Sequence, residues 1–139
     1  MAQSEHLPIY KAAYDACLYF EQVVRNFSRY HKYSIGQDLR DGTRRVLRLI
    51  VRANARQDKV PVLLDIREEV EELKVLLRLC NDAKAFANFN SFEHGIRLVT
   101  DIARQNEGWL KSQRQGRSPE RAGQNRRVIL KETAEPSVP

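Results

Sequence analysis

Residues 34–56 carry two opposed patterns that an α-helix separates onto different faces. A helix turns once in about 3.6 residues, and at this period the apolar side chains share one side: Leu39, Val46, Leu49, Ile50 and Ala53. Arginines recur at every fourth position on the other side: Arg40, Arg44, Arg48, Arg52 and Arg56, with Arg45 beside them. The segment therefore predicts one helix with a core face and a basic face.

A few residues near the start of this segment indicate where the helix begins and whether its arginines have acidic partners. Ser34 followed by Gln37 fits a capping box, which predicts where the helix begins. Asp38 and Asp41 are the acids of the segment, and both lie in its first turns. The arginines thus have almost no acidic partners one turn away, and like charges at this spacing repel. A solvated helix surface is one interpretation of the stripe, and a binding face for a phosphate backbone is the other.

Three more segments repeat apolar residues at alternating steps of three and four. In the helix predicted over residues 8–29 these are Ile9, Ala13, Ala16, Phe20, Val23 and Phe27. Tyr30 is the last residue of this series and follows the predicted end of the helix. After Pro61 they are Leu63, Ile66, Val70, Leu73, Leu77 and Cys80. After a cap at Ser91 they are Phe92, Ile96, Val99, Ala103, Asn106 and Leu110. This spacing is typical of helices that pack side by side.

Individual residues of these segments carry further expectations. Gly95 and Gly108 are unfavourable inside a helix, so we expect them where helices approach closely. Trp109 is expected to pack and to find a hydrogen-bond partner for its indole. Tyr10 and Tyr14 widen the apolar stripe of the first helix and are expected to pack against a neighbour.

The two segments that lack this periodicity leave alternatives open. In the loop that starts at Arg29, basic residues alternate with Tyr30 and Tyr33, which suits stacking on bases, although the tyrosines fit the closed end of a bundle equally well. From residue 115 onward the chain is polar and rich in glycine, proline and arginine, which predicts a disordered, flexible basic tail over 115–139. Its RRVILK sequence, residues 126–131, is either a docking segment or ordinary tail.

The four segments and their short connections predict an all-α protein, an antiparallel up-down four-helix bundle over residues 1–114. Apolar residues beyond the main seams, such as Leu76 and Leu79, favour self-association. The net charge of +6 is concentrated early, with ten Lys and Arg against five Asp and Glu in residues 1–56. The chain has no apolar run that would span a membrane and no secretory signal, so we expect a cytoplasmic protein without membrane contact.

The residues that usually carry chemistry show no catalytic or metal-binding pattern. His6, His31 and His94 lack ligand spacing, and Cys17 and Cys80 fall on apolar positions as expected for buried thiols. The acids after Pro61 lack the ExxH spacing of di-iron bundles and are interpreted as a solvated face or as contacts to basic residues of a neighbouring chain. We therefore predict no cofactor, no metal and no enzymatic activity.

Two stretches carry a family resemblance. "YHKYSIGQDLRDGTRRVLRLIVRAN", followed by the leucine-rich third segment and "NFNSFEHGIRLVTDIARQNEGWLKSQ", resembles the accessory variability determinant (Avd) proteins of diversity-generating retroelements. The resemblance covers residues 6–114, and its most specific marks are residues 36–40 and the Gln-x-x-Gly-Trp ending at Trp109. Avd proteins are similar in turn to four-helix-bundle proteins encoded by intervening sequences in bacterial ribosomal RNA genes.

The resemblance implies a basic, barrel-shaped homopentamer that binds nucleic acid, either RNA or DNA, and the reverse transcriptase of the element. Such a protein supports mutagenic cDNA synthesis and retrohoming, while the polymerase does the chemistry. The helical wheel assigns the nucleic-acid-binding residues: Arg29, Lys32, Arg40, Arg44, Arg45, Arg48, Arg52 and Arg56. The alternative is an oligomeric interaction module of the ribosomal intervening-sequence type.

Overall fold

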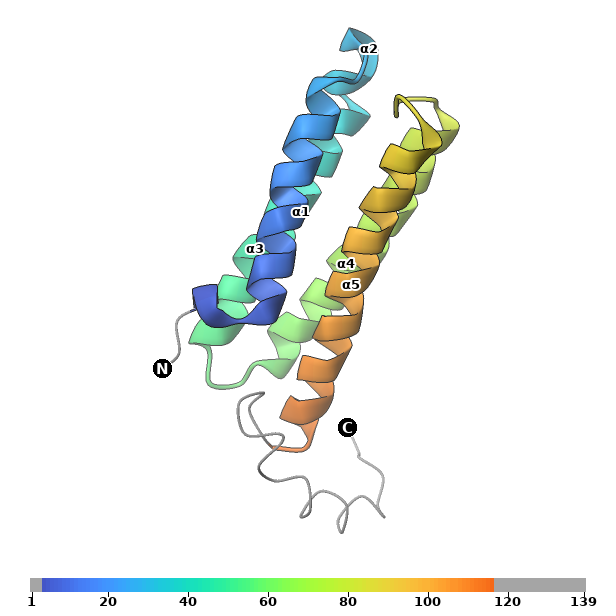
Figure 1. Ribbon diagram of the computed structural model, residues 1–139. Helices are drawn as coiled ribbons and strands as arrows, with labels where there is room; N and C mark the ends of the chain where they lie inside the picture. The colour runs from blue at the N-terminus through green and yellow to red at the C-terminus, as the bar shows by residue number, and fades with distance from the viewer. Residues whose placement is uncertain (1–3, 117–139) are drawn as a thin grey trace.

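The computed structural model describes residues 4–116, all of whose regular structure is helical. A short 3-10 turn, Ser4–His6, precedes helix α1, Pro8–Arg25. The remaining helices are α2, Arg29–Lys32; α3, Ile35–Ala55; α4, Val60–Asp82; and α5, Phe89–Arg114. Figure 1 shows α1, α3, α4 and α5 as long helices that run alternately up and down. The predicted tail, including its RRVILK segment, lies outside the described residues.

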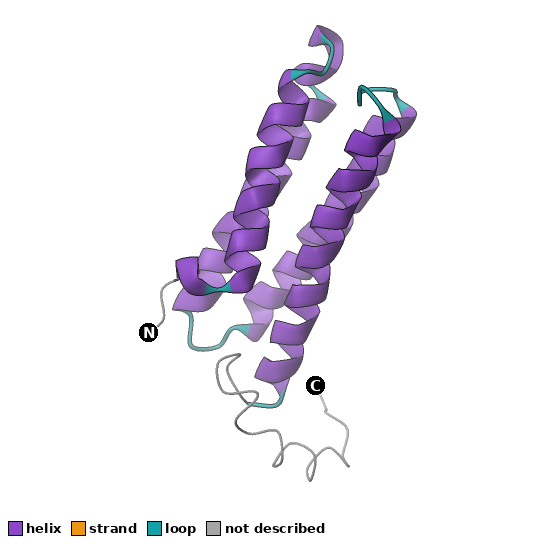
Figure 2. Cartoon of the chain, viewed as in Figure 1, coloured by secondary structure: helices purple, strands orange, loops and turns teal. Residues whose placement is uncertain are grey.

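The four long helices form the predicted antiparallel up-down bundle. Helix α1 packs against α3 and α5, and α4 packs against the same two helices, so each helix has two neighbours. The connections lie at the two ends of the bundle, as Figure 2 shows. Short connections of this kind suit antiparallel neighbours. None of the helices in residues 4–116 combines the length and hydrophobicity needed to cross a membrane.

The end of α1 differs from the prediction. The helix ends at Arg25 instead of continuing to residue 29, and the predicted loop contains the one-turn helix α2. Ser28 caps α2 by accepting a hydrogen bond from the backbone N–H of His31. Within α1, Val24 is fully buried while the predicted Val23 is only partly buried, and beyond the end of the helix Tyr30 is 82% exposed. Tyr30 therefore does not belong to the core, and neither it nor the exposed Tyr33 closes the end of the bundle.

Helix α3 begins where the sequence indicates, but without the predicted capping box. The Ser34 hydroxyl donates to the carbonyl of Tyr30 at 2.9 Å, because the preceding helical turn brings this carbonyl within reach. Gln37 donates to Asp41 instead of reaching back to residue 34. At the other end, the Lys59 ammonium donates to the carbonyls of Ala53, Asn54 and Arg56. This lysine satisfies carbonyl groups that a helix end leaves free.

Helix α4 follows its predicted pattern most closely. All six apolar positions of its seam are buried. They are Leu63, Ile66, Val70, Leu73, Leu77 and Cys80. Because α4 packs against two helices, the apolar side chains of every turn are buried. An uninterrupted apolar pattern therefore identifies the core residues well.

Helix α5 starts earlier than predicted and buries a somewhat different set of residues. Asn88 caps the helix by accepting from the N–H of Ser91, so Ser91 is not the cap. The fully buried side chains include Ile102 and Trp109, whereas Phe92, Ile96 and Ala103 are only partly buried. The Trp109 indole N–H has no hydrogen-bond partner within residues 4–116, contrary to expectation.

The two glycines of α5 have different roles. A Cβ atom at Gly95 would lie 2.9 Å from Cε1 of Phe20, so a close approach of α1 and α5 requires glycine there. Nothing lies within 4 Å of the corresponding position at Gly108. The prediction of close helix approach is therefore confirmed for Gly95 and wrong for Gly108.

Candidate nucleic-acid interface

The arginines of α3 point in three directions and do not form one continuous outward stripe. Arg40 and Arg44 turn toward α1, where they meet Glu21. Arg45 turns toward Glu69 of α4. The other two arginines of the helix, Arg48 and Arg52, lie exposed along a groove between α3 and α4.

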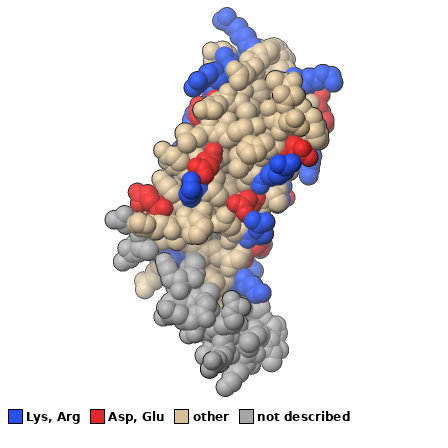
Figure 3. All heavy atoms as spheres, in the orientation of Figure 1, with Lys and Arg blue, Asp and Glu red and all other residues tan. Residues whose placement is uncertain are grey.

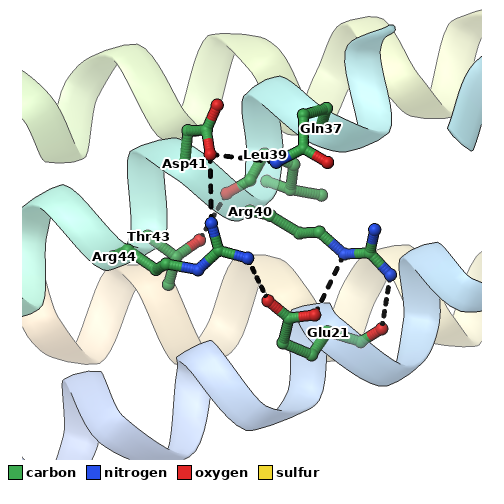
Figure 4. A network of polar contacts seen from close by, with 7 residues as sticks. All are labelled: Glu21, Gln37, Leu39, Arg40, Asp41, Thr43 and Arg44. Carbon is green, nitrogen blue, oxygen red and sulfur yellow. Dashed lines mark hydrogen bonds and ion pairs between the residues drawn. The ribbon is translucent and has the colours of Figure 1, made fainter. Parts of the chain in front are cut away.

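Glu21 holds the first two arginines in the network that Figure 4 shows. Nη2 of Arg44 lies 2.5 Å from Oε2 of Glu21, and Nη1 of Arg44 lies 3.1 Å from Oδ1 of Asp41. Nε of Arg40 lies 3.1 Å from Oε1 of Glu21, an ion pair without hydrogen-bond alignment. Nη2 of Arg40 also donates to the backbone carbonyl of Glu21 at 3.2 Å. These contacts join α1 to α3.

The environment of the network limits its access to a ligand. The Arg40 side chain is only 14% exposed. The hydrogen bond to Glu21 raises the pKa of Arg44, since it stabilises the charged guanidinium. Both arginines are therefore already paired with acids of the protein, Arg40 in a mostly buried position and Arg44 with 43% of its side chain exposed. The sequence suggested arginines without acidic partners, and this is wrong for Arg40 and Arg44, because an acid from another helix supplies the pairing.

Arg45 is paired in a similar way on the other side of α3. Its Nε donates to Oε1 of Glu69 at 3.1 Å, across the contact between α3 and α4. Half of the Arg45 side chain is exposed, so the pair lies at the edge of a groove and not in the core. A surface ion pair of this kind contributes little to stability.

Arg48, Arg52 and Arg56 form the part of the stripe that is available to a ligand. All three side chains are exposed, and none has an ion-pair partner within 4 Å among residues 4–116. They follow one another at intervals of four residues: Arg48 and Arg52 lie in the last turns of α3, and Arg56 is its C-terminal cap, in an extended conformation. The rise of about 6 Å between Arg48 and Arg52 along the helix matches the spacing of successive phosphates on a nucleic-acid strand in order of magnitude. We call these three residues the arginine strip.

Acidic side chains of α4 lie next to the arginine strip. Arg48 and Arg52 line a shallow groove of about 410 Å³ between α3 and α4, with Asp65 and Glu68 on its α4 side. The carboxylates of α4 thus lie across the groove from the arginines without an ion pair to them. They restrict a polyanion to the α3 side of this groove.

Arg29 and Lys32 lie at the other end of the molecule. Arg29 is exposed and Lys32 is partly buried on α2, next to the exposed rings of Tyr30 and Tyr33. Figure 1 shows α2 at one end of the bundle, while α3 ends at the opposite end. The sixteen residues from Lys32 to Arg48 correspond to about 24 Å of helix. The predicted basic residues therefore form two separate clusters, joined by arginines that are paired internally.

One further cation belongs to the cluster at α2. Arg25 is exposed in the last turn of α1, four residues before the first residue of α2. Sequence reasoning placed it inside a longer helix and missed it. The signal was the Asn-Phe-Ser sequence at 26–28, which ends one helix and caps the next.

The face made by α1 and α5 differs from the end of α3. Figure 3 shows Lys and Arg side chains next to Asp and Glu side chains on this face, separated by a broad uncharged surface. Several of these charges pair within one helix, for example Arg97 with Glu93 and Lys11 with Asp15. Such a mixed surface gives no directed attraction for a polyanion.

Metal binding and thiol reactivity depend on the His, Cys, Asp and Glu side chains of the described residues. Within residues 4–116 no group of three or more His, Cys, Asp or Glu side chains is arranged to hold a metal ion. Burial raises the pKa of the Cys17 thiol and of the Cys80 thiol to about 11. Both thiols are therefore protonated at neutral pH and are weak nucleophiles.

The fold and this surface define a class of protein: a four-helix bundle with exposed arginines at one end of one helix. The bAvd-like family model matches residues 7–113, which span all four long helices. The chain therefore belongs to the bAvd-like family. Comparisons with curated proteins and with solved structures found no match.

Proposed function

We propose that this protein is a non-catalytic accessory protein of a diversity-generating retroelement. It binds nucleic acid and the reverse transcriptase of the element, and it supports mutagenic cDNA synthesis and retrohoming while the polymerase performs the chemistry. The observation that carries the proposal is the unpaired arginine strip on α3 of a chain that belongs to the bAvd-like family.

The chemistry of the arginine strip supports binding to a phosphate backbone. Arginine forks match phosphate oxygens, and each contact releases condensed counterions, so affinity falls as salt rises. The strip is one side of a helix, without a second element that would bring it to base edges. Binding is therefore expected to depend weakly on base sequence and more strongly on the shape of the nucleic acid.

An oligomer would increase the effect of three arginines. We propose a homopentamer, in which five copies of the strip act on one polyanion. The exposed apolar residues Tyr14, Leu18 and Val51 support association, since a small bundle rarely leaves several large apolar side chains in water without a partner. The reverse transcriptase is proposed as the protein partner because the family acts with this enzyme.

A binding titration with matched variants tests the proposal. Fluorescent structured RNA and duplex DNA are titrated with the protein at about 50 and 200 mM salt, and the mass of the assembly is measured in the same buffers. The test variant carries Arg48→Gln, Arg52→Gln and Arg56→Gln. The control variant carries Lys11→Gln, Arg97→Gln and Arg104→Gln, which removes the same charge from exposed residues of α1 and α5.

We expect salt-sensitive binding by an oligomer, lost in the test variant and retained in the control. Equal loss in both variants would show a general charge effect and contradict a defined interface. Absence of binding by the unmodified protein would contradict the nucleic-acid role and favour an oligomeric interaction module of the ribosomal intervening-sequence type.

A further inference from the structure

A groove that combines acidic and apolar side chains lies between the N-terminal half of α3 and the C-terminal part of α4. It has a volume of about 360 Å³. Four carboxylates line it: Asp38, Asp41, Glu69 and Glu72. Its apolar wall includes Val75 and Leu79, which are 62% and 51% exposed. We call it the acidic groove.

Two of these carboxylates are free to bind a cation. Asp41 is engaged with Arg44, and Glu69 is engaged with Arg45. Asp38 and Glu72 form no ion pair within the described residues 4–116. An apolar strip beside two unpaired carboxylates fits a short peptide that carries apolar residues between basic ones.

We infer that the acidic groove docks residues 126–131 of the same chain. This segment has the sequence RRVILK, in which Arg126, Arg127 and Lys131 flank three consecutive aliphatic residues. Its cations complement Asp38 and Glu72, and its aliphatic side chains cover Val75 and Leu79. The inference does not depend on nucleic-acid binding, because the groove and the arginine strip have no residue in common.

The chain is long enough to reach the groove from the end of α5. Arg67 of α4 pairs with Glu107 of α5, and the two helices are antiparallel, so Val75 lies level with residue 99. From there to Arg114 is about 22 Å along the axis at 1.5 Å per residue. The groove lies one interhelical spacing to the side, about 10 Å. Residues 115–125 span up to about 36 Å when extended, which exceeds the straight-line distance.

The other grooves of the bundle suit this segment less well. The groove beside the arginine strip is lined by three arginines and three acids, so it has no excess of negative charge to attract a basic peptide. The groove between α4 and α5 has Arg67, Lys74 and Arg104 on its walls. Of these three grooves, the acidic groove alone has more acids than bases together with exposed aliphatic side chains.

Photocrosslinking of the full-length protein tests this docking. Ile129→p-benzoylphenylalanine places a photoreactive group in the middle of the segment. The protein is irradiated as an equal mixture of isotopically labelled and unlabelled chains, and the crosslinked peptides are identified by mass spectrometry. Docking predicts crosslinks to residues 72–79 within the same chain. Crosslinks elsewhere on the bundle, crosslinks between labelled and unlabelled chains, or no crosslinks would overturn the inference.

A pair of charge variants tests the role of the carboxylates. Asp38→Asn with Glu72→Gln alters exposed positions only, so the bundle is expected to remain folded, which circular dichroism checks. The yield of crosslinks to residues 72–79 should fall about fivefold, as the loss of two partly exposed ion pairs predicts. The control, Asp15→Asn with Glu93→Gln, removes two carboxylates from α1 and α5 and should leave the yield unchanged. An equal fall in both double variants would contradict the inference.

Discussion

The Arg44 guanidinium on α3 lies 2.5 Å from the Glu21 carboxylate on α1. In the sequence, the arginines of α3 belong to one repeating pattern, but this ion pair shows that they have two different roles. The first arginines of the helix hold it to its neighbour, and the last ones remain available to a partner. The proposed surface for nucleic acid is therefore limited to one end of the helix and does not extend along its whole length.

The first prediction concerns Glu21. The substitution Glu21→Gln leaves the mostly buried Arg40 without a counter-charge, and a buried charge that loses its partner destabilises a protein. Because the pair is partly solvated, we expect a decrease in the free energy of unfolding of about 1–2 kcal/mol. Urea denaturation measures it. The control Glu93→Gln breaks an exposed pair of 3.4 Å on α5 and should cost less than about 0.5 kcal/mol. Equal effects would contradict the structural role of Glu21.

Most of the fold could be predicted from the sequence because the core residues recur periodically. The seam of α4 is uninterrupted from Leu63 to Cys80, and every one of its predicted positions is buried. The end of α1 was harder to predict, since Val23 and Val24 are adjacent valines, and steps of three and of four residues from Phe20 both fit a helical period of about 3.6. The Asn88 cap was missed for a similar reason: Ser91, three residues later, offers the same chemistry.

The candidate site was less predictable than the fold. The basic face of α3 is visible in the sequence, but the partner of Arg44 lies 23 positions away on another helix. A helical wheel shows which side a residue occupies and not which neighbour covers that side. Only the arrangement of the four helices distinguishes the paired Arg40 from the exposed Arg52.

The second prediction uses the two glycines of α5. Gly95→Ala places a methyl group against the buried ring of Phe20, which should destabilise the protein by about 1–3 kcal/mol despite the better helix propensity of alanine. Gly108→Ala enters open space and should stabilise it by about 0.5–1 kcal/mol. Thermal unfolding of the two variants should show shifts of opposite sign. A stabilised Gly95→Ala variant would contradict the close approach of α1 and α5.

The third prediction concerns pH and the pair between Arg67 and Glu107. Two hydrogen bonds of 2.8 Å from Arg67 lower the pKa of the Glu107 carboxyl. A carboxyl with a lowered pKa in the folded state stabilises the protein above its unfolded pKa of about 4.3, and this contribution is lost as pH falls through the folded value. Glu107→Gln should therefore be less stable than the unmodified protein at pH 7.

The difference should be below about 1 kcal/mol, since both side chains are largely exposed, and it should close at acid pH. Denaturation at neutral pH and at about pH 3 measures both values. A difference that widens at the acid pH would contradict the assignment.

The fourth prediction concerns the thiols. Burial raises the pKa of Cys17 and of Cys80 to about 11, so both should react slowly with iodoacetamide at neutral pH. Cys17 is partly exposed and Cys80 is fully buried, so Cys17 should react first. Mass spectrometry of tryptic peptides over time measures both rates. Faster modification of Cys80 in the folded protein would contradict its place in the core.

The measurement that tests the central claim most directly is the slope of log affinity against log salt concentration for structured RNA. For the unmodified protein we predict a steep negative slope. Each arginine of the strip that is replaced by glutamine should reduce the magnitude of this slope by about one, because one phosphate fewer is neutralised. The same slope for the unmodified protein and for the variant with Arg48→Gln, Arg52→Gln and Arg56→Gln would show that the end of α3 is not the binding surface.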